Sequence, residues 1–111
     1  METNDALLAL AALAQATRLA IFRLLVQQGP EGVAAGGIAE ALTLPNATLS
    51  FHLKEMANAG LIYPRQESRF IYYVANYEAM NGLIGYLTKN CCGGKACVPA
   101  ARQAVKHRRS A

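Results

Sequence analysis

The sequence predicts a mainly α-helical domain that carries one β-hairpin. Apolar residues recur at helical spacing in several segments, and two β-prone runs stand close together with a polar stretch between them. The length of 111 residues suits one hydrophobic core rather than two, and the 53% hydrophobic and 16% charged content excludes wholesale disorder. The expected order is two helices, a pair of shorter helices, the hairpin and a last helix.

Two helices are expected at the start of the chain. Thr3 or Asn4 is expected to cap the first helix, which should end near Ala14. The second should run over residues 16–28, because its large apolar side chains follow helical spacing and a glycine-proline pair comes directly after it.

A short helix through residues 38–42, a tight turn and a polar-faced helix follow. Pro45 suits the first position of the polar-faced helix, since no backbone N–H is needed there. Gly60 is expected to end it. Its apolar side should face the core and consists of Leu49, Leu53 and Met56.

The hairpin is predicted over residues 61–65 and 70–74, with residues 66–69 between the two strands. Asn76 is expected to cap the last helix, and Gly93-Gly94 to close it. One apolar stripe is expected along that helix, made of Met80, Leu83, Ile84, Leu87 and Cys91.

This order of elements is typical of a winged helix-turn-helix, in which the polar-faced helix enters the major groove of DNA. Asn46 suits an adenine edge, Phe51 suits a thymine methyl group, and Lys54 suits a phosphate. Exposed polar residues on a helix are also ordinary solvated positions, Phe51 can instead pack on the hairpin, and His52 can instead be a half-buried histidine. The remaining candidate contacts are Thr48 and Ser50 on the helix and Arg65 and Arg69 beside the hairpin tip.

Four segments, 10–21, 41–54, 59–62 and 69–73, closely resemble the helix-turn-helix and wing of the ArsR/SmtB metalloregulators. The resemblance spans about residues 6–90. It implies a homodimer built on the first and last helices that binds an imperfect inverted repeat in double-stranded operator DNA as a repressor. The contacts of that family would fall on Asn46, Ala47, Thr48, Ser50, Phe51 and His52. Alanine at 47 replaces a frequent serine and removes one hydroxyl.

All three cysteines, Cys91, Cys92 and Cys97, lie within seven residues. Thiolates bind soft ions, and three of them without a fourth ligand suit As(III) or Sb(III). Structural zinc would need a fourth ligand and a different spacing. Two other interpretations stay open: the cysteines are incidental, or they form disulfides or persulfides. Residues 34–36, Ala-Ala-Gly, replace the Cys-Val-Cys of many arsenic sensors, so the chain resembles the arsenite-responsive members with cysteines after the last helix.

We therefore expect a DNA-binding and dimerisation domain over residues 1–92 and a metalloid-binding segment with a basic tail over residues 93–111. Residues 1–94 carry six Lys/Arg and seven Asp/Glu, whereas the tail carries five basic residues and no acid. The expected function is an arsenite-released repressor in the cytoplasm, with no membrane partner, organic cofactor or enzymatic activity. The rivals are a repressor that responds to thiol oxidation or sulfane sulfur, and an arsenic-binding scaffold for proteins, which salt-dependent duplex binding would exclude.

Overall fold

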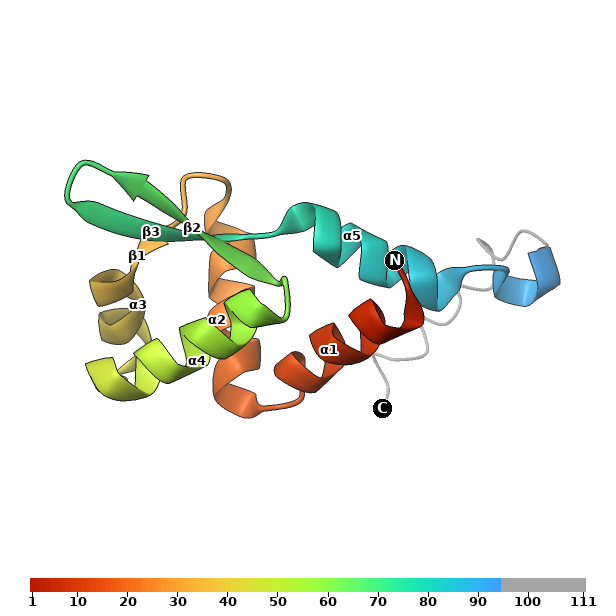
Figure 1. Cartoon of the computed structure of the whole chain (residues 1–111), viewed down its shortest axis with the longest axis horizontal. Coiled ribbons are helices and arrows are strands. Elements are labelled where there is room, and N and C mark those ends of the chain that lie inside the picture. Colours follow the sequence, from red (N-terminus) through yellow and green to blue (C-terminus); the bar gives the residue numbers. More distant parts are fainter. Residues whose placement is uncertain (95–111) are drawn as a thin grey trace, which may run out of the picture.

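The computed structural model describes residues 1–94 and confirms the predicted order of helices and hairpin (Figure 1). The helices are α1 (Thr3–Leu13), α2 (Ala16–Gln28), α3 (Ala35–Leu42), α4 (Asn46–Asn58) and α5 (Tyr77–Thr88). The strands are β1 (Val33–Ala34), β2 (Ile62–Glu67) and β3 (Phe70–Ala75), and a 3₁₀ turn, η1, covers Cys91–Gly94. These elements form a winged helix-turn-helix, with α3 and α4 as the two helices of the motif and β2–β3 as the wing.

The sheet has three antiparallel strands in the order β1-β3-β2, not the two that the sequence predicts. Val33 lies opposite Tyr73 and Ala34 opposite Tyr72, so β1 covers the inner edge of the hairpin. The sequence around β1 is rich in glycine and alanine and carries no period-2 pattern. Two residues paired to a distant strand leave no local signal, so the sequence pattern does not predict β1.

Gly32 lies where the chain enters β1, and its backbone φ is +81°. A Cβ atom there would lie 2.7 Å from the carbonyl oxygen of Tyr73 and 2.9 Å from Cγ2 of Val74. The close approach of β1 to β3 therefore requires a residue without a side chain.

We expect Gly32→Ala to lower the free energy of unfolding by about 3 kcal/mol, because a left-handed alanine and the forced separation of β1 from β3 both contribute. Gly60→Ala is the matched control: its φ is +79°, but nothing lies within 4 Å of the added carbon. That control should lose only about 1–2 kcal/mol. Urea denaturation measures both values, and equal losses would contradict the role given to Gly32.

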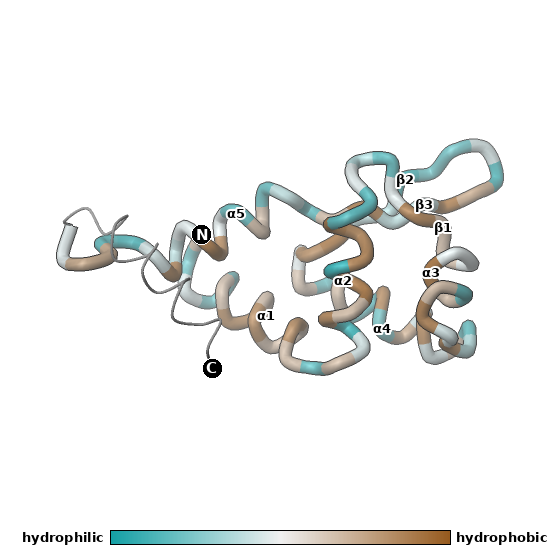
Figure 2. The backbone as a smooth tube through the Cα atoms, turned by 180° about the vertical axis from the view of Figure 1, so that it is seen from behind, coloured by the Kyte–Doolittle hydropathy of each residue, from teal (hydrophilic) through white to brown (hydrophobic). Residues whose placement is uncertain are grey.

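The hydrophobic core lies between the helices and the inner face of the sheet. Leu49, Leu53 and Met56 of α4 are all buried, as their spacing predicts. The largest fully buried side chains come from α2, α3, α4, the residue before β2 and the sheet, and are Ile21, Leu25, Ile38, Leu49, Met56, Leu61 and Val74. Hydrophobic stretches run along α1, α2 and β3 (Figure 2). Burial of this set holds α4 so that its opposite face points to solvent.

Several helix boundaries differ from the sequence prediction. Glu2, rather than Thr3 or Asn4, is the N-cap of α1, and its backbone N–H donates to Oδ2 of Asp5 over 3.1 Å. Pro45 is the N-cap of α4 rather than its first helical residue, and α3 begins at Ala35 rather than near Ile38. The positions at which helices begin and end depend on tertiary contacts as much as on the capping residue.

The predicted cap of α5 is confirmed, since Asn76 Oδ1 accepts from the Ala79 backbone N–H over 3.1 Å. The predicted end is wrong. The helix stops at Thr88, so Cys91 does not continue its apolar stripe but lies in η1. The backbone has positive φ at Asn90 and Cys92, which breaks the helical path before the glycine pair that was expected to break it.

Helices α1 and α5 lie side by side at the end of the molecule away from α3 and the wing (Figures 1 and 2). The hydroxyl groups of Thr3 and Tyr86 join them over 2.6 Å. None of the helices in residues 1–94 is by itself long and apolar enough to cross a membrane; only the bent pair α1 and α2, at 104° to each other, has the required length and composition.

Candidate nucleic-acid interface and thiol site

The outward face of α4 carries six of the nine predicted DNA-contacting residues. All six are exposed, and they are Asn46, Ala47, Thr48, Ser50, Phe51 and Lys54. They share a face because the buried residues of α4 occupy the other one. An α-helix with amide, hydroxyl and methyl groups on an open face fits the major groove of B-DNA.

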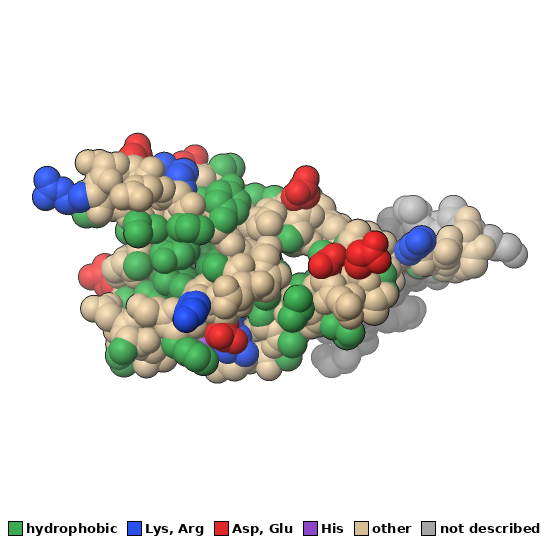
Figure 3. All heavy atoms as spheres, viewed as in Figure 1, with side chains coloured by type: hydrophobic (Ala, Val, Ile, Leu, Met, Phe, Trp, Pro, Cys, Tyr) green, Lys and Arg blue, Asp and Glu red, His purple; other side chains and the backbone are tan. Residues whose placement is uncertain are grey.

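Phe51 is the most apolar residue of this face and is 58% exposed. Its ring meets the ring of His52 edge-on at 5.7 Å between centroids. It lies four residues after Ala47 and three after Thr48, so the three side chains are neighbours on the helix surface. Figure 3 shows hydrophobic atoms beside a basic side chain on this part of the surface. This exposure does not support the alternative expectation that Phe51 packs on the hairpin.

His52 is only 8% exposed and does not lie on the open face. Its Nδ1 is 3.4 Å from Nη1 of Arg18, whose Nε donates to the Ala12 carbonyl oxygen over 2.7 Å. The prediction that His52 touches DNA is therefore not supported by its position, and the half-buried alternative describes it better. The spacing of apolar residues along α4 places residue 52 at the edge of the stripe and does not reveal this partner.

The two wing arginines have different positions. Arg69 is exposed in the two-residue turn between β2 and β3, where it can reach a phosphate or a groove. Arg65 is not beside the tip: it lies within β2 opposite Tyr72, with its guanidinium 4.8 Å from the centre of that ring. Its Nη2 donates to the Glu31 carbonyl oxygen over 2.5 Å, and its Nη1 pairs with Glu67 over 3.0 Å.

These bonds tie the wing to the loop after α2. Arg65 is therefore better explained as a structural residue than as a DNA contact. The strands are longer than predicted, and this moves the tip from residues 66–69 to Ser68 and Arg69. The pattern of β-prone residues does not predict where the pairing of β2 with β3 ends, because the polar residues at the end of β2 resemble turn residues.

Cys91 and Cys92 lie in η1, directly after α5, and both are exposed. Their Sγ atoms are 3.7 Å apart. Adjacent side chains on a regular helix would diverge by about 100°. The left-handed backbone of Cys92, with φ of 58°, removes this divergence. Two thiolates that each bind one ion at about 2.3 Å would be roughly 3.3–3.8 Å apart for bond angles of about 90–109°.

The third predicted ligand, Cys97, and the basic tail lie outside the described residues. Within residues 1–94, no three His, Cys, Asp or Glu side chains are grouped closely enough to hold a metal ion. The separation of the Cys91 and Cys92 thiols is compatible with two ligands of one soft ion.

Large apolar side chains are exposed on α1 and α5. They are Leu7, Leu8, Leu10, Ile84 and Leu87, and all except Leu10 are more than half exposed. Leu83, by contrast, is buried, so the predicted stripe of α5 is divided between the core and solvent. An exposed apolar surface of this kind is typical of an interface between proteins.

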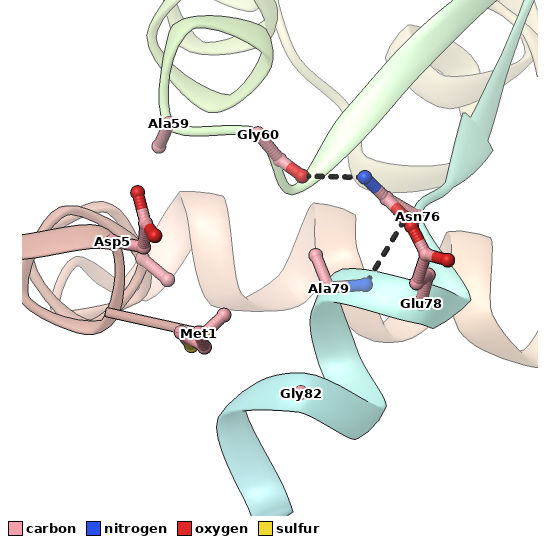
Figure 4. A pocket seen from close by; sticks show the side chains of 9 residues that line it. Met1, Asp5, Ala59, Gly60, Asn76, Glu78, Ala79 and Gly82 are labelled. Carbon is pink, nitrogen blue, oxygen red and sulfur yellow. Dashed lines mark hydrogen bonds between the residues drawn. The ribbon is translucent and has the colours of Figure 1, made fainter. Parts of the chain in front are cut away.

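A pocket of about 410 Å³ separates these two helices from the turn after α4 (Figure 4). Asp5 and Met1 line it from the α1 side, and Ala79 and Gly82 line it from α5. Beside it, Asn76 Nδ2 donates to the Gly60 carbonyl oxygen over 2.9 Å (Figure 4). This hydrogen bond holds the start of α5 to the turn after α4.

The fold and the open face of α4 define a winged helix-turn-helix protein. Residues 13–64, which contain α2, α3 and α4, match a family model described as a helix-turn-helix domain. No curated protein matches the chain in sequence. Solved structures do match it, and they indicate a transcriptional regulator with a DNA-binding helix-turn-helix.

HlyU from Vibrio cholerae N16961 is 28% identical, with a TM-score of 0.64, over 83% of this chain and 99% of that one. An ArsR-like transcriptional regulator from Rhodococcus sp. RHA1 has a TM-score of 0.72 at 23% identity, over 91% and 92% of the two chains. The homodimeric winged helix-turn-helix domain of Mb0332 from Mycobacterium bovis, described as a possible ArsR-family transcriptional regulator, is 25% identical with a TM-score of 0.63, over 83% and 85%.

Proposed function

We propose that this chain is a homodimeric ArsR-family repressor of an arsenic-resistance operon. It binds an imperfect inverted repeat in operator DNA and leaves it when As(III) or Sb(III) binds the thiolates of Cys91, Cys92 and Cys97. The observation that carries the proposal is a pair of exposed thiols, 3.7 Å apart, on the same chain as an exposed major-groove helix. Soft trivalent ions prefer such thiolates over oxygen and nitrogen ligands.

The dimer is proposed to form through the exposed leucines and isoleucine of α1 and α5. The homodimeric state of the Mycobacterium bovis neighbour supports this arrangement. Two copies related by a twofold axis would present two α4 helices to successive major grooves, which matches an inverted repeat.

We define the DNA-reading face as the exposed face of α4. Helix α5 connects the two thiols to the helices that carry and position this face. Asn90 and Lys89 join η1 to the end of α5, and Tyr86 bonds to Thr3 of α1. At the other end of α5, the Tyr77 hydroxyl donates to the Val26 carbonyl oxygen over 3.0 Å, which fixes α5 to α2. When Cys91 and Cys92 hold an ion together with Cys97, the 93–97 segment is pulled back over the end of α5, which is at Thr88. The resulting strain on α5 changes how the dimer helices pack.

A binding experiment tests the proposal directly. The full chain, kept reduced, is titrated onto the duplex upstream of its own coding sequence at several salt concentrations, with and without arsenite. We expect salt-dependent binding to the duplex and a 5- to 150-fold loss of affinity with arsenite, the range typical of allosteric coupling. Binding that arsenite does not change would contradict the effector, and absence of binding would contradict the repressor.

The same pair of thiols favours a second candidate, a repressor that responds to thiol oxidation or sulfane sulfur. Mass spectrometry of the protein separates the two. An arsenite-responsive chain gains arsenic while it stays reduced and releases DNA in that state. A redox-responsive chain releases DNA only after its thiols have formed disulfide or persulfide, with no arsenic added.

Substitution of Phe51 tests whether this residue recognises thymine in the DNA sequence. A duplex in which uracil replaces thymine lacks the C5-methyl group and changes nothing else in the major groove. We expect the wild-type chain to bind that duplex about 4-fold more weakly for each methyl group that Phe51 contacts, since one buried methyl group contributes about 0.8 kcal/mol. Phe51→Ala should bind both duplexes equally.

Lys54→Gln is the matched control for Phe51→Ala, because both residues are exposed on the same helix face. A lost phosphate contact should weaken binding to both duplexes by the same factor and reduce the salt dependence. Fluorescence anisotropy measures all six combinations. If Phe51→Ala keeps the wild-type preference for thymine, Phe51 does not read the methyl group.

A further inference from the structure

Arg18 connects three helices at one corner of the molecule. It is the third residue of α2, and its backbone N–H donates to Oε1 of the N-cap residue Gln15 over 2.8 Å. Its Nε donates to the carbonyl oxygen of Ala12, in the last turn of α1, over 2.7 Å. Its Nη1 lies 3.4 Å from Nδ1 of His52 on α4. One guanidinium group thus contacts the end of α1 and the middle of α4.

The chemistry of this contact sets the roles of its two atoms. A guanidinium group only donates hydrogen bonds, so Nη1 of Arg18 donates and Nδ1 of His52 accepts. Within residues 1–94, His52 is the one polar or charged side chain in the buried class. A buried polar group is retained at little cost only when it has a partner, and Arg18 supplies that partner.

The contact lies between the two surfaces that the proposed function uses. Helix α1 carries the exposed leucines of the dimer face, and α4 carries the DNA-reading face. In the part of the chain that the structure describes, no other side-chain hydrogen bond leads from α1 toward α4. Apolar packing alone would allow α4 to slide or turn against α1, whereas a directional bond at each end of a planar group does not.

We propose that Arg18 and His52 are positioning residues that set the orientation of α4 relative to the dimer helix α1. This rests on the proposed function, because the orientation matters only when two α4 helices must fit two major grooves at once. The bond then fixes the distance between the two recognition helices of a dimer, and it carries a shift of the α1–α5 pair to the DNA-reading face. His52 acts from the interior and touches no base.

The test compares a complete inverted repeat, selected by the wild-type chain from random duplexes, with a duplex that contains one half-site. His52→Leu removes the acceptor and keeps an apolar side chain of similar size. We expect it to bind the inverted repeat roughly 10-fold more weakly, on the scale of known couplings, and the single half-site within 2-fold of wild type. The best-bound half-site spacing should also change by a base pair.

Two further variants separate positioning from folding. His52→Asn keeps an acceptor at the place of Nδ1 and should restore the wild-type ratio between the two duplexes. Arg18→Lys keeps the charge but replaces the planar fork, whose Nε and Nη1 face two different partners, with one compact ammonium group, so it should repeat the effect of His52→Leu. Thermal unfolding shows which variants are folded, and if His52→Leu is not, the comparison rests on the other two.

The possible results test the proposed function and the positioning role separately. If wild type binds the repeat and the folded variants bind it equally well, the positioning role is wrong and the repressor stands. If a variant loses affinity for the half-site and the repeat by the same factor, His52 contributes within one subunit, and the positioning role is again wrong. If wild type binds no duplex, the proposed function fails and the positioning role fails with it.

Discussion

Replacement of any one of Cys91, Cys92 and Cys97 by serine is expected to abolish release of the operator by arsenite and to leave operator binding within 2-fold of wild type. Serine has nearly the shape of cysteine, but its hydroxyl is a hard, protonated ligand that soft ions do not select. Cys91 and Cys92 are exposed and lie beyond the last turn of α5, so neither substitution removes core packing. The wild-type loss of 5- to 150-fold should therefore fall to about 1-fold in each variant.

Thr88→Ser is the matched control for the cysteine variants. It is a similarly small change close to the thiols, and the serine hydroxyl can keep the 2.7 Å bond that Thr88 Oγ1 donates to the Ile84 carbonyl oxygen. This variant should release the operator as wild type does. Titration of operator-bound protein with arsenite, followed by anisotropy, measures the release. Release that survives all three cysteine substitutions would reject the thiol site.

Leu87→Glu is expected to convert the dimer into monomers and to weaken operator binding by about 10²-fold or more. Leu87 is 60% exposed in the single chain, so the substitution costs little in a monomer. In the proposed dimer, its carboxylate would be buried against apolar side chains without a partner. A monomer binds each half-site separately and loses the high effective concentration of the second α4, which accounts for the size of the effect.

Ile71→Glu tests whether this effect is specific to the α1–α5 surface. Ile71 is also an exposed apolar residue, but it lies on the wing strand β3. Sedimentation equilibrium should find this variant dimeric and Leu87→Glu monomeric at the same concentration. A dimeric Leu87→Glu protein with wild-type affinity for the inverted repeat would show that the dimer uses another surface.

The residues of the two expected effects lie at the same end of α5, since Leu87 is in its last turn and Cys91 and Cys92 follow it. Cys91 and Cys92 lie just beyond α5, the proposed dimer face lies on α5 and α1, and Asn76 holds the start of α5 to the turn after α4. A pocket of about 410 Å³ lies beside this hydrogen bond, between α5 and the turn after α4 (Figure 4). In the proposed repressor, an effector that bends the end of α5 acts on both recognition helices through these contacts.

Local patterns in the sequence determined most of the fold. The bounds of α2, the inward face of α4 and the Asn76 cap follow from apolar spacing, glycine and proline positions and capping chemistry. These features depend on residues within four positions of one another. The local sequence is therefore sufficient to predict them. The exposed face of α4 follows in turn from its buried one.

Only the tertiary structure decided the features that join distant segments. The strand β1 exists because β3 supplies its hydrogen bonds, Arg65 is held by Glu31 and Tyr72, and His52 is buried against Arg18. The separation of 3.7 Å between the two thiols also depends on the left-handed backbone of Cys92, which no sequence pattern predicts. In each case a side chain or strand obtains its partner from another part of the chain, and the energy of that pairing is absent from any local window.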